Sequence, residues 1–250
     1  MDEILISIIT LLIASFINFL AKSIYNRITG ANKSFLWKNK FPSLEEMKSS
    51  IEFEDLKKRV RILVIDDEDG FPVNIFQSEG YNIEKWSKVN DYGKLERGYY
   101  DLIVLDIKGV ASHISSDDGL GVLDNLKKSN PSQIIIAHSQ HSFDLGKSRF
   151  WELADENIPK PCDFLKMKSI IDNLILSKYT PSRYFGYLEQ ILKNNKYSTK
   201  QINKINNKIA EVIRNNTQPN WPKIIESDNP TSFLVKQVSS IGNTLIRIFK

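Results

Sequence analysis

The chain has 250 residues, of which 41% are hydrophobic and 26% charged, a composition typical of a globular protein and not of a disordered or collagen-like one. Its single cysteine, Cys162, excludes an internal disulfide framework and a cysteine-rich zinc site. The formal net charge of +4 is uneven: residues 1–21 carry −2, 22–60 carry +4, 61–176 carry −6 and 177–250 carry +8. An acidic middle therefore lies between basic flanks, and these blocks define four predicted parts.

The first part, residues 1–21, is predicted to be a transmembrane anchor. Residues 4–21 contain no charge, and a helix of about 20 apolar residues crosses the hydrocarbon core of a bilayer. The acidic start and the lack of a small-residue cleavage site disfavour a secretory signal, which leaves a buried core helix as the other alternative. Because Lys and Arg follow the apolar run, we expect a single-pass protein of the bacterial inner membrane with its bulk in the cytoplasm.

Residues 22–60 are predicted to be a basic linker with a short helix. Ser43 and Glu46 have the spacing of a capping box. A sparse apolar stripe follows, so the simpler interpretation is a linker helix that packs on the next domain. A dimerising signalling helix is the alternative, but the heptads are few.

Residues 61–176 alternate between short apolar runs and segments suited to helices. The predicted strands lie within 61–67, 81–89, 102–106, 134–137 and 157–161. The predicted helices lie within 72–78, 92–97, 119–128, 143–154 and 163–176. Continuous apolar strands that alternate with helices are typical of a parallel sheet covered on both faces. The predicted fold class is therefore α/β, a five-stranded doubly wound parallel sheet.

Polar side chains follow these apolar runs, and the residues concerned are Asp66, Asp67, Asp106, Ser139 and Lys160. In doubly wound sheets the site lies at the carboxyl ends of the strands. Three carboxylates at that edge would repel one another unless a divalent cation lies among them, and Mg²⁺ binds such carboxylates together with water and phosphate oxygens. A carboxylate can also act as a nucleophile and form an aspartyl phosphate. The oxygens of that phosphate need a cation and a hydroxyl as partners.

With these residues in order, residues 61–176 resemble a response-regulator receiver domain of two-component signalling. The pieces that carry the resemblance are IDD at 65–67, LIVLD at 102–106, DGL at 118–120, Ser139 and the Lys160–Pro161 pair. The resemblance implies a flavodoxin-like receiver fold in which Asp106 accepts a phosphoryl group and Ser139 and Lys160 bind its oxygens. It also implies a Mg²⁺ site made by Asp66, Asp67, Asp106 and the backbone carbonyl of Lys108. The partners implied are a histidine kinase or another phosphodonor protein and a downstream protein. Pairing with a second copy in a homodimer is an alternative that the sequence leaves open.

The sequence departs from the family pattern near the predicted site. The segment from Asp106 to Asp118 is longer than usual, and the first helix is short with Pro72 in its first turn. Gln140 and Asn157 stand where the family often has a small and an aromatic residue. These differences imply altered partner access. They favour an alternative function: an atypical receiver that works without phosphorylation as a membrane-tethered interaction scaffold, for example in a bacterial defence or stress system.

Two other chemistries are disfavoured by the residues. Phosphatases of the haloacid dehalogenase type need a second Asp two positions after the nucleophile as general acid, and here that position holds Lys108. No separate enzymatic activity is therefore predicted. A zinc site of His138, His141 and Cys162 lacks a fourth ligand. His138 is expected to face away from Ser139 because adjacent strand residues alternate.

Residues 177–250 are predicted to be a basic helical C-terminal region. Apolar residues recur at helical spacing over 187–212 and 233–248, on either side of a break at 215–222. The +8 charge is a signal for nucleic acid, but no helix-turn-helix or zinc-finger pattern accompanies it, so nucleic acid is not an expected partner. We expect the final helix to pack on the receiver, pair with a second copy or lie on the bilayer.

Overall fold

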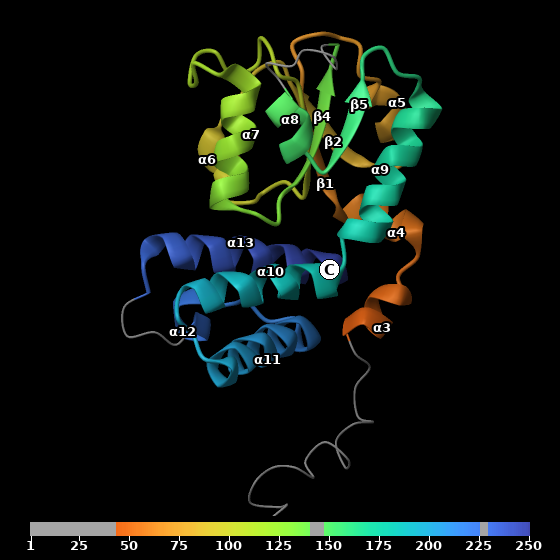
Figure 1. Cartoon of the computed structure of the whole chain (residues 1–250). Coiled ribbons are helices and arrows are strands. Elements are labelled where there is room, and N and C mark those ends of the chain that lie inside the picture. The colour runs from red at the N-terminus through yellow and green to blue at the C-terminus, as the bar shows by residue number, and fades with distance from the viewer. Residues whose placement is uncertain (1–43, 141–147, 226–229) are drawn as a thin grey trace, which may run out of the picture. The chain divides into compact units, whose positions relative to one another are not determined.

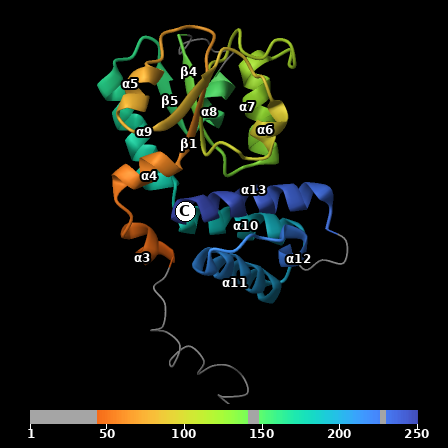
Figure 2. The same ribbon diagram turned by 180° about the vertical axis from the view of Figure 1, so that it is seen from behind.

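The computed structural model describes residues 44–140, 148–225 and 230–250, which are drawn in colour in Figures 1 and 2. The predicted anchor, residues 1–21, lies outside the described residues. Among the helices that are described, none has the length and hydrophobicity needed to span a bilayer. The anchor and the membrane location that depends on it therefore stay predictions.

Five parallel strands form one sheet. They are β1 (Arg61–Ile65), β2 (Asn82–Trp86), β3 (Leu102–Leu105), β4 (Ile134–Ser139) and β5 (Glu156–Pro159). Their order is β2-β1-β3-β4-β5, and every neighbouring pair is parallel. This is the doubly wound order of flavodoxin-like folds. The predicted five-stranded parallel sheet is confirmed.

Helices cover both faces of the sheet because its strands are apolar on both sides. On one face, Val64 shares a hydrophobic cluster with Phe76 of α5 (Val73–Ser78) and Ile171 of α9 (Phe164–Lys178). The other face is covered by α6 (Tyr92–Glu96), α7 (Asp118–Ser129) and α8 (Ser148–Leu153), whose side chains share a second cluster with Leu63 and Ile65. Figures 1 and 2 show these two layers from opposite sides. The short first helix after β1, α5, is confirmed at six residues.

The basic C-terminal region forms four helices beneath the sheet (Figure 1). They are α10 (Pro181–Asn194), α11 (Thr199–Asn215), α12 (Trp221–Ile225) and α13 (Ser232–Phe249). A capping box of Ser198 and Gln201 starts α11. Asn216, in the left-handed conformation, ends it at the predicted break.

Helix α13 packs against the base of the sheet. The side chain of Gln237 donates to the carbonyl of Ser129 at 3.2 Å, and Asn130 donates to Ser240 at 3.0 Å. Gly98 has a φ of +65°, and a Cβ there would lie 1.9 Å from Ser240 Oγ, so only glycine permits this approach. The sheet face that includes Val64 and the helices α9, α10 and α13 share one hydrophobic cluster. Three positions were expected for the final helix: on the receiver-like domain, against a second copy or on the bilayer. The structure shows the first of these, with the helix packed on the α/β layer.

Two short helices precede the sheet. They are α3 (Leu44–Ser49), the helix predicted after Ser43, and α4 (Phe53–Arg59). Leu44 and Leu56 are buried in the same cluster as α10 and α13, and Arg59 donates to the carbonyl of Ile248 at 2.9 Å. This packing agrees with the simpler interpretation of a linker helix that covers the next domain.

A partly buried ion cluster joins α7, β4 and α9. The carboxylate of Asp155 accepts from Lys127 Nζ at 2.5 Å, from Lys178 Nζ at 2.9 Å and from the N–H of Ile135 at 2.9 Å. Burial by itself would raise the pKa of Asp155, but these donors outweigh it and hold the pKa below its ordinary value of 3.8. Burial lowers the pKa of Lys127, so this cation depends on Asp155 for its compensation.

Acidification is therefore expected to weaken the fold through Asp155. A carboxyl whose pKa is lowered by folding contributes stability above its unfolded pKa, and this contribution is lost as the pH falls from about 4 through the folded value. Asp155→Asn should cost about 2 kcal/mol at pH 7 and should flatten the loss of stability below pH 4. Urea unfolding across this pH range measures both effects, with the exposed neighbour Glu156→Gln as control. Equal pH profiles for the wild type and Asp155→Asn would contradict the assignment.

Candidate functional site

The sequence-predicted site residues gather at the carboxyl edge of the sheet. Asp66 follows β1, Asp106 follows β3, Ser139 ends β4 and Lys160 follows β5. The Nζ atom of Lys160 lies 2.8 Å from Asp66 Oδ1 and 2.5 Å from Asp106 Oδ2. The backbone of Lys160 is aligned by β4, because its N–H donates to the carbonyl of buried Ser139 at 3.1 Å. Three distant segments of the chain thus meet at one ammonium group.

A cluster of carboxylates surrounds this ammonium group. One oxygen atom from each of Asp66, Asp67 and Asp106 lies within 4.8 Å of the others. Asp66 and Asp106 are buried, whereas Asp67 is exposed. Glu68 adds a fourth carboxylate, 3.2 Å from Lys160 Nζ. Among the described residues, Lys160 is the one ammonium in contact with these four groups, so the edge keeps a negative charge that favours a cation.

Lys160 remains charged in this environment. Burial alone would lower the pKa of its ammonium group, but hydrogen bonds to Asp106 and Asp66 more than reverse the effect and the pKa lies above its ordinary value of 10.5. The side chain is 7% exposed. Lys160 therefore acts as a fixed cation between the ends of the strands.

One oxygen of Asp66 is left open. Its Oδ1 accepts from Lys160 and from the N–H of Glu68 at 3.0 Å, but its buried Oδ2 has no hydrogen-bond partner in the described part of the chain. The Nε2 atom of His138 lies 3.8 Å from this oxygen. His138 Nδ1 lies 2.9 Å from the carbonyl of Ile158, which can only accept, so Nδ1 carries the proton.

The state of His138 explains why that oxygen is open. Burial lowers the pKa of His138, so the ring is neutral at pH 7 and its Nε2 presents a lone pair to Asp66. A lone pair donates no hydrogen bond to this buried oxygen, and most buried polar atoms have either a donor or a cation as partner. Oxygen ligands and a negative local charge are what Mg²⁺ prefers. The residues at this edge fit that ion.

The predicted backbone ligand, Lys108, lies beside the cluster. The carboxylate of Asp67 lies against the next residue, Gly109, where a Cβ would come within 2.2 Å of Asp67 Oδ2. Gly109 has a φ of +80°, so a side chain there would add backbone strain to the clash. The Lys108 side chain is exposed. The structure therefore brings the Lys108–Gly109 segment to the acidic cluster, and the role of its carbonyl stays a prediction.

The long segment after Asp106 is folded tightly next to the site. The carboxylate of Asp118 accepts from the N–H of Gly109 at 2.7 Å and of Ala111 at 2.6 Å. The N–H of Val89 donates to the carbonyl of Val110 at 2.8 Å, which ties the segment to the chain after β2. The segment borders a pocket of about 440 Å³. The extra residues thus shape the surface that a partner would meet beside Asp106.

The structure adds two residues that the sequence analysis did not assign to the site. Glu68 contacts Lys160 and also accepts from Gln140 at 3.4 Å, and the acidic run that begins at Asp66 was the signal for it. His138 lies on the same face of the sheet as Asp66, and its ring lies next to the Asp66 carboxylate. The periodicity indicated which face His138 occupies, but not that Asp66 shares it.

Comparisons with known proteins give matches among solved structures only. No family model matches the sequence, and no curated protein matches it. Similar solved structures include a CheY-like receiver domain protein from Methanospirillum hungatei JF-1, with 22% identity, a TM-score of 0.40, and coverage of 48% of this chain and 95% of that one. A two-component response regulator from Clostridium difficile has 20% identity, a TM-score of 0.38, and coverage of 47% and 95%.

A third similar structure is NtrX from Brucella abortus in complex with ATP, with 19% identity, a TM-score of 0.40, and coverage of 62% of this chain and 35% of that one. At these levels of similarity, the fold assignment rests on the strand order and parallel register of the sheet itself. Any function has to rest on the residues at its carboxyl edge.

Proposed function

We propose that the protein is a receiver of phosphorelay signalling that accepts a phosphoryl group on Asp106. The observation that carries the proposal is the contact of one buried ammonium, on Lys160, with both Asp66 and Asp106, beside a buried carboxylate oxygen that has no hydrogen-bond partner among the described residues. Most buried polar side-chain atoms in proteins have a hydrogen-bond partner. A site that binds a metal cation and then a phosphoryl anion needs both an open carboxylate oxygen and a fixed ammonium group.

The chemistry proposed is a phosphoryl transfer. An oxygen of Asp106 attacks the phosphorus of the donor, the bond from phosphorus to the donor breaks, and the donor group leaves with the electron pair and takes up a proton. Lys160 neutralises a phosphoryl oxygen, and the Ser139 hydroxyl donates to another. Bound Mg²⁺ would supply further positive charge at these oxygens, and Asp66, Asp67, Asp106 and the Lys108 carbonyl would hold it.

The loss of the Lys160 contact with Asp106 provides the switch in this proposal. Lys160 bridges β5 to β1 and β3 through Asp66 and Asp106. When Asp106 carries a phosphoryl group, its Oδ2 no longer binds Lys160 in the same way, and the ends of these strands readjust. A histidine kinase or another phosphodonor protein supplies the group, and a downstream protein or a second copy reads the change. The predicted anchor holds the protein at the inner membrane.

The alternative is a scaffold that works without phosphorylation. It is favoured by the six-residue α5 and by the folded segment after Asp106, both of which change the surfaces next to the site. The two functions differ in one property: only the first requires a reactive Asp106.

Incubation of the 250-residue chain with Mg²⁺ and acetyl phosphate tests the proposal. We expect one base-labile phosphate per chain in the wild type, no incorporation in Asp106→Asn, and no incorporation when EDTA removes Mg²⁺. The matched control is Asp124→Asn, because Asp124 lies on α7 in a surface ion pair with Lys128. Intact-mass spectrometry measures the product. A folded wild type that takes up no phosphate, or an Asp106→Asn variant that takes up as much as the wild type, would favour the scaffold.

A further inference from the structure

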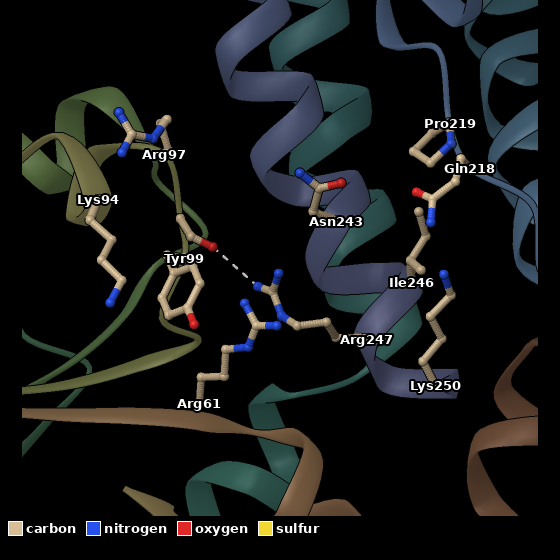
Figure 3. A pocket seen from close by; sticks show the side chains of 11 residues that line it. Arg61, Lys94, Arg97, Tyr99, Gln218, Pro219, Asn243, Ile246, Arg247 and Lys250 are labelled. Atoms are coloured by element: carbon tan, nitrogen blue, oxygen red, sulfur yellow. Dashed lines mark hydrogen bonds between the residues drawn. The ribbon is translucent and has the colours of Figure 1, made fainter. Parts of the chain in front are cut away.

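A basic pocket lies at the opposite end of the sheet from the carboxylates. Arg61 begins β1, whereas Asp66 follows its last residue. The pocket has a volume of about 420 Å³, within the range of small-molecule sites. It is lined by cationic side chains from three elements and by one aromatic ring: Arg61, Lys94, Arg97, Tyr99, Arg247 and Lys250. Figure 3 shows the guanidinium groups of Arg61 and Arg247 extending toward each other from β1 and α13.

The positive charge of the pocket is only partly compensated. Among the described residues, no acidic side chain lines the pocket. Arg247 pairs with the buried Asp101 at 2.6 Å, and Lys94 lies 3.7 Å from Glu84. Within residues 44–140, 148–225 and 230–250, the side chains of Arg61, Arg97 and Lys250 form no ion pair. Cations gathered in one hollow create a positive potential that attracts an anion.

Several of these groups are held in place before any ligand binds. Arg247 donates to the carbonyl of Gly98 at 3.1 Å, the bond drawn as a dashed line in Figure 3, and to Thr244 Oγ1 at 2.9 Å. The guanidinium of Arg61 lies 4.3 Å from the ring centre of Tyr99, and Lys94 Nζ lies 4.2 Å from it. Cation–π contacts of this kind restrain both side chains. A restrained site loses less entropy when a ligand binds.

We propose that this pocket binds a soluble anion with two or more linked phosphate groups, of the size of a nucleoside diphosphate or triphosphate. Arginine recognises phosphate through paired N–H donors. The unpaired cations lie on both sides of the pocket: Arg61 and Arg97 on the α/β layer, and Lys250 at the end of α13. A chain of linked phosphates can therefore contact more of these cations than a single phosphate group can. The pocket is concave and small, which fits a small molecule and not a nucleic-acid duplex.

Binding at this position links two layers of the molecule. A ligand that contacts Arg61 and Arg247 together joins β1 to α13. Because it binds the folded form, it raises stability by mass action. The inference is independent of phosphoryl transfer at Asp106, since the two sites lie at opposite ends of the sheet.

Calorimetric titration of the 250-residue chain in EDTA tests the proposal. The probes are inorganic tripolyphosphate, ATP and orthophosphate. We expect saturable binding of tripolyphosphate and ATP with one site per chain, at least tenfold weaker binding of orthophosphate, and a loss of affinity with added salt. Arg61→Gln and Arg97→Gln should each weaken binding about tenfold. Arg97 is exposed, so its variant folds even if that of Arg61 does not.

The controls separate this site from others. Arg149→Gln removes an arginine on α8 that pairs with Asp124, and it should leave affinity unchanged. Asp106→Asn should also bind tripolyphosphate as the wild type does. A soluble short-chain phosphatidylinositol bisphosphate tests a lipid headgroup as the source of the phosphates. Tighter binding of that lipid than of ATP and tripolyphosphate, no saturable binding of either soluble probe, or equal affinity in Arg97→Gln and the wild type would overturn the proposal.

Discussion

Lys160→Met is expected to destabilise the protein by about 3–5 kcal/mol when divalent cations are absent, because it leaves buried carboxylates without their cation. The Lys160 side chain contacts Asp66, Asp106 and Glu68, and Asp66 is fully buried. Methionine has a similar length and no charge, so the loss measures the ion pairs more than a cavity. Urea unfolding of the 250-residue chain in detergent and EDTA, followed by tryptophan fluorescence, gives the free energy.

Magnesium should restore part of this loss. Without Lys160, the carboxylates of Asp66 and Asp106 have no competing ammonium, so added Mg²⁺ is expected to stabilise Lys160→Met more than the wild type by mass action. The matched control is Lys166→Met, a change of an exposed lysine at the start of α9. Wild-type stability of Lys160→Met in EDTA, together with an equal response to Mg²⁺, would show that these carboxylates do not form a cation site.

Arg247→Met is the second change with a large expected effect, again about 3–5 kcal/mol. The Asp101 side chain is completely buried and accepts from Arg247 Nη2 at 2.6 Å and from the N–H of Arg61 at 2.9 Å. Burial would lower the pKa of Arg247, but Asp101 more than reverses this and raises it. Removal of the arginine leaves a buried carboxylate at the junction of the sheet and α13.

A double-mutant cycle separates the ion pair from packing. Asp101→Asn with Arg247→Met should cost less than the sum of the two single changes, because each single change leaves the other partner uncompensated. Arg214→Met, on the exposed face of α11, is the control and should change stability by less than about 0.5 kcal/mol. A mild effect of Arg247→Met would mean that the buried pair with Asp101 contributes little net stability.

The sheet and the centre of the site were predictable from the sequence because the signals for them are local. A continuous apolar run such as residues 102–105 indicates a strand buried on both faces. In a parallel sheet, the residue that follows each strand lies at the same edge. Asp66, Asp106 and Lys160 could therefore be placed together without any knowledge of the loops between them.

Tertiary structure alone decided which surfaces cover one another. The apolar stripe of α13 predicted a helix with one buried face, but most of the helix is buried between α10 and the base of the sheet. The apolar periodicity of a helix indicates that one of its faces avoids water. It does not indicate which surface packs against that face. The same limit holds for His138, which meets Asp66 across the sheet, and for the basic pocket. Arg61 and Arg247 stand at opposite ends of the described chain, and only the packing of α13 on the sheet brings their charges together.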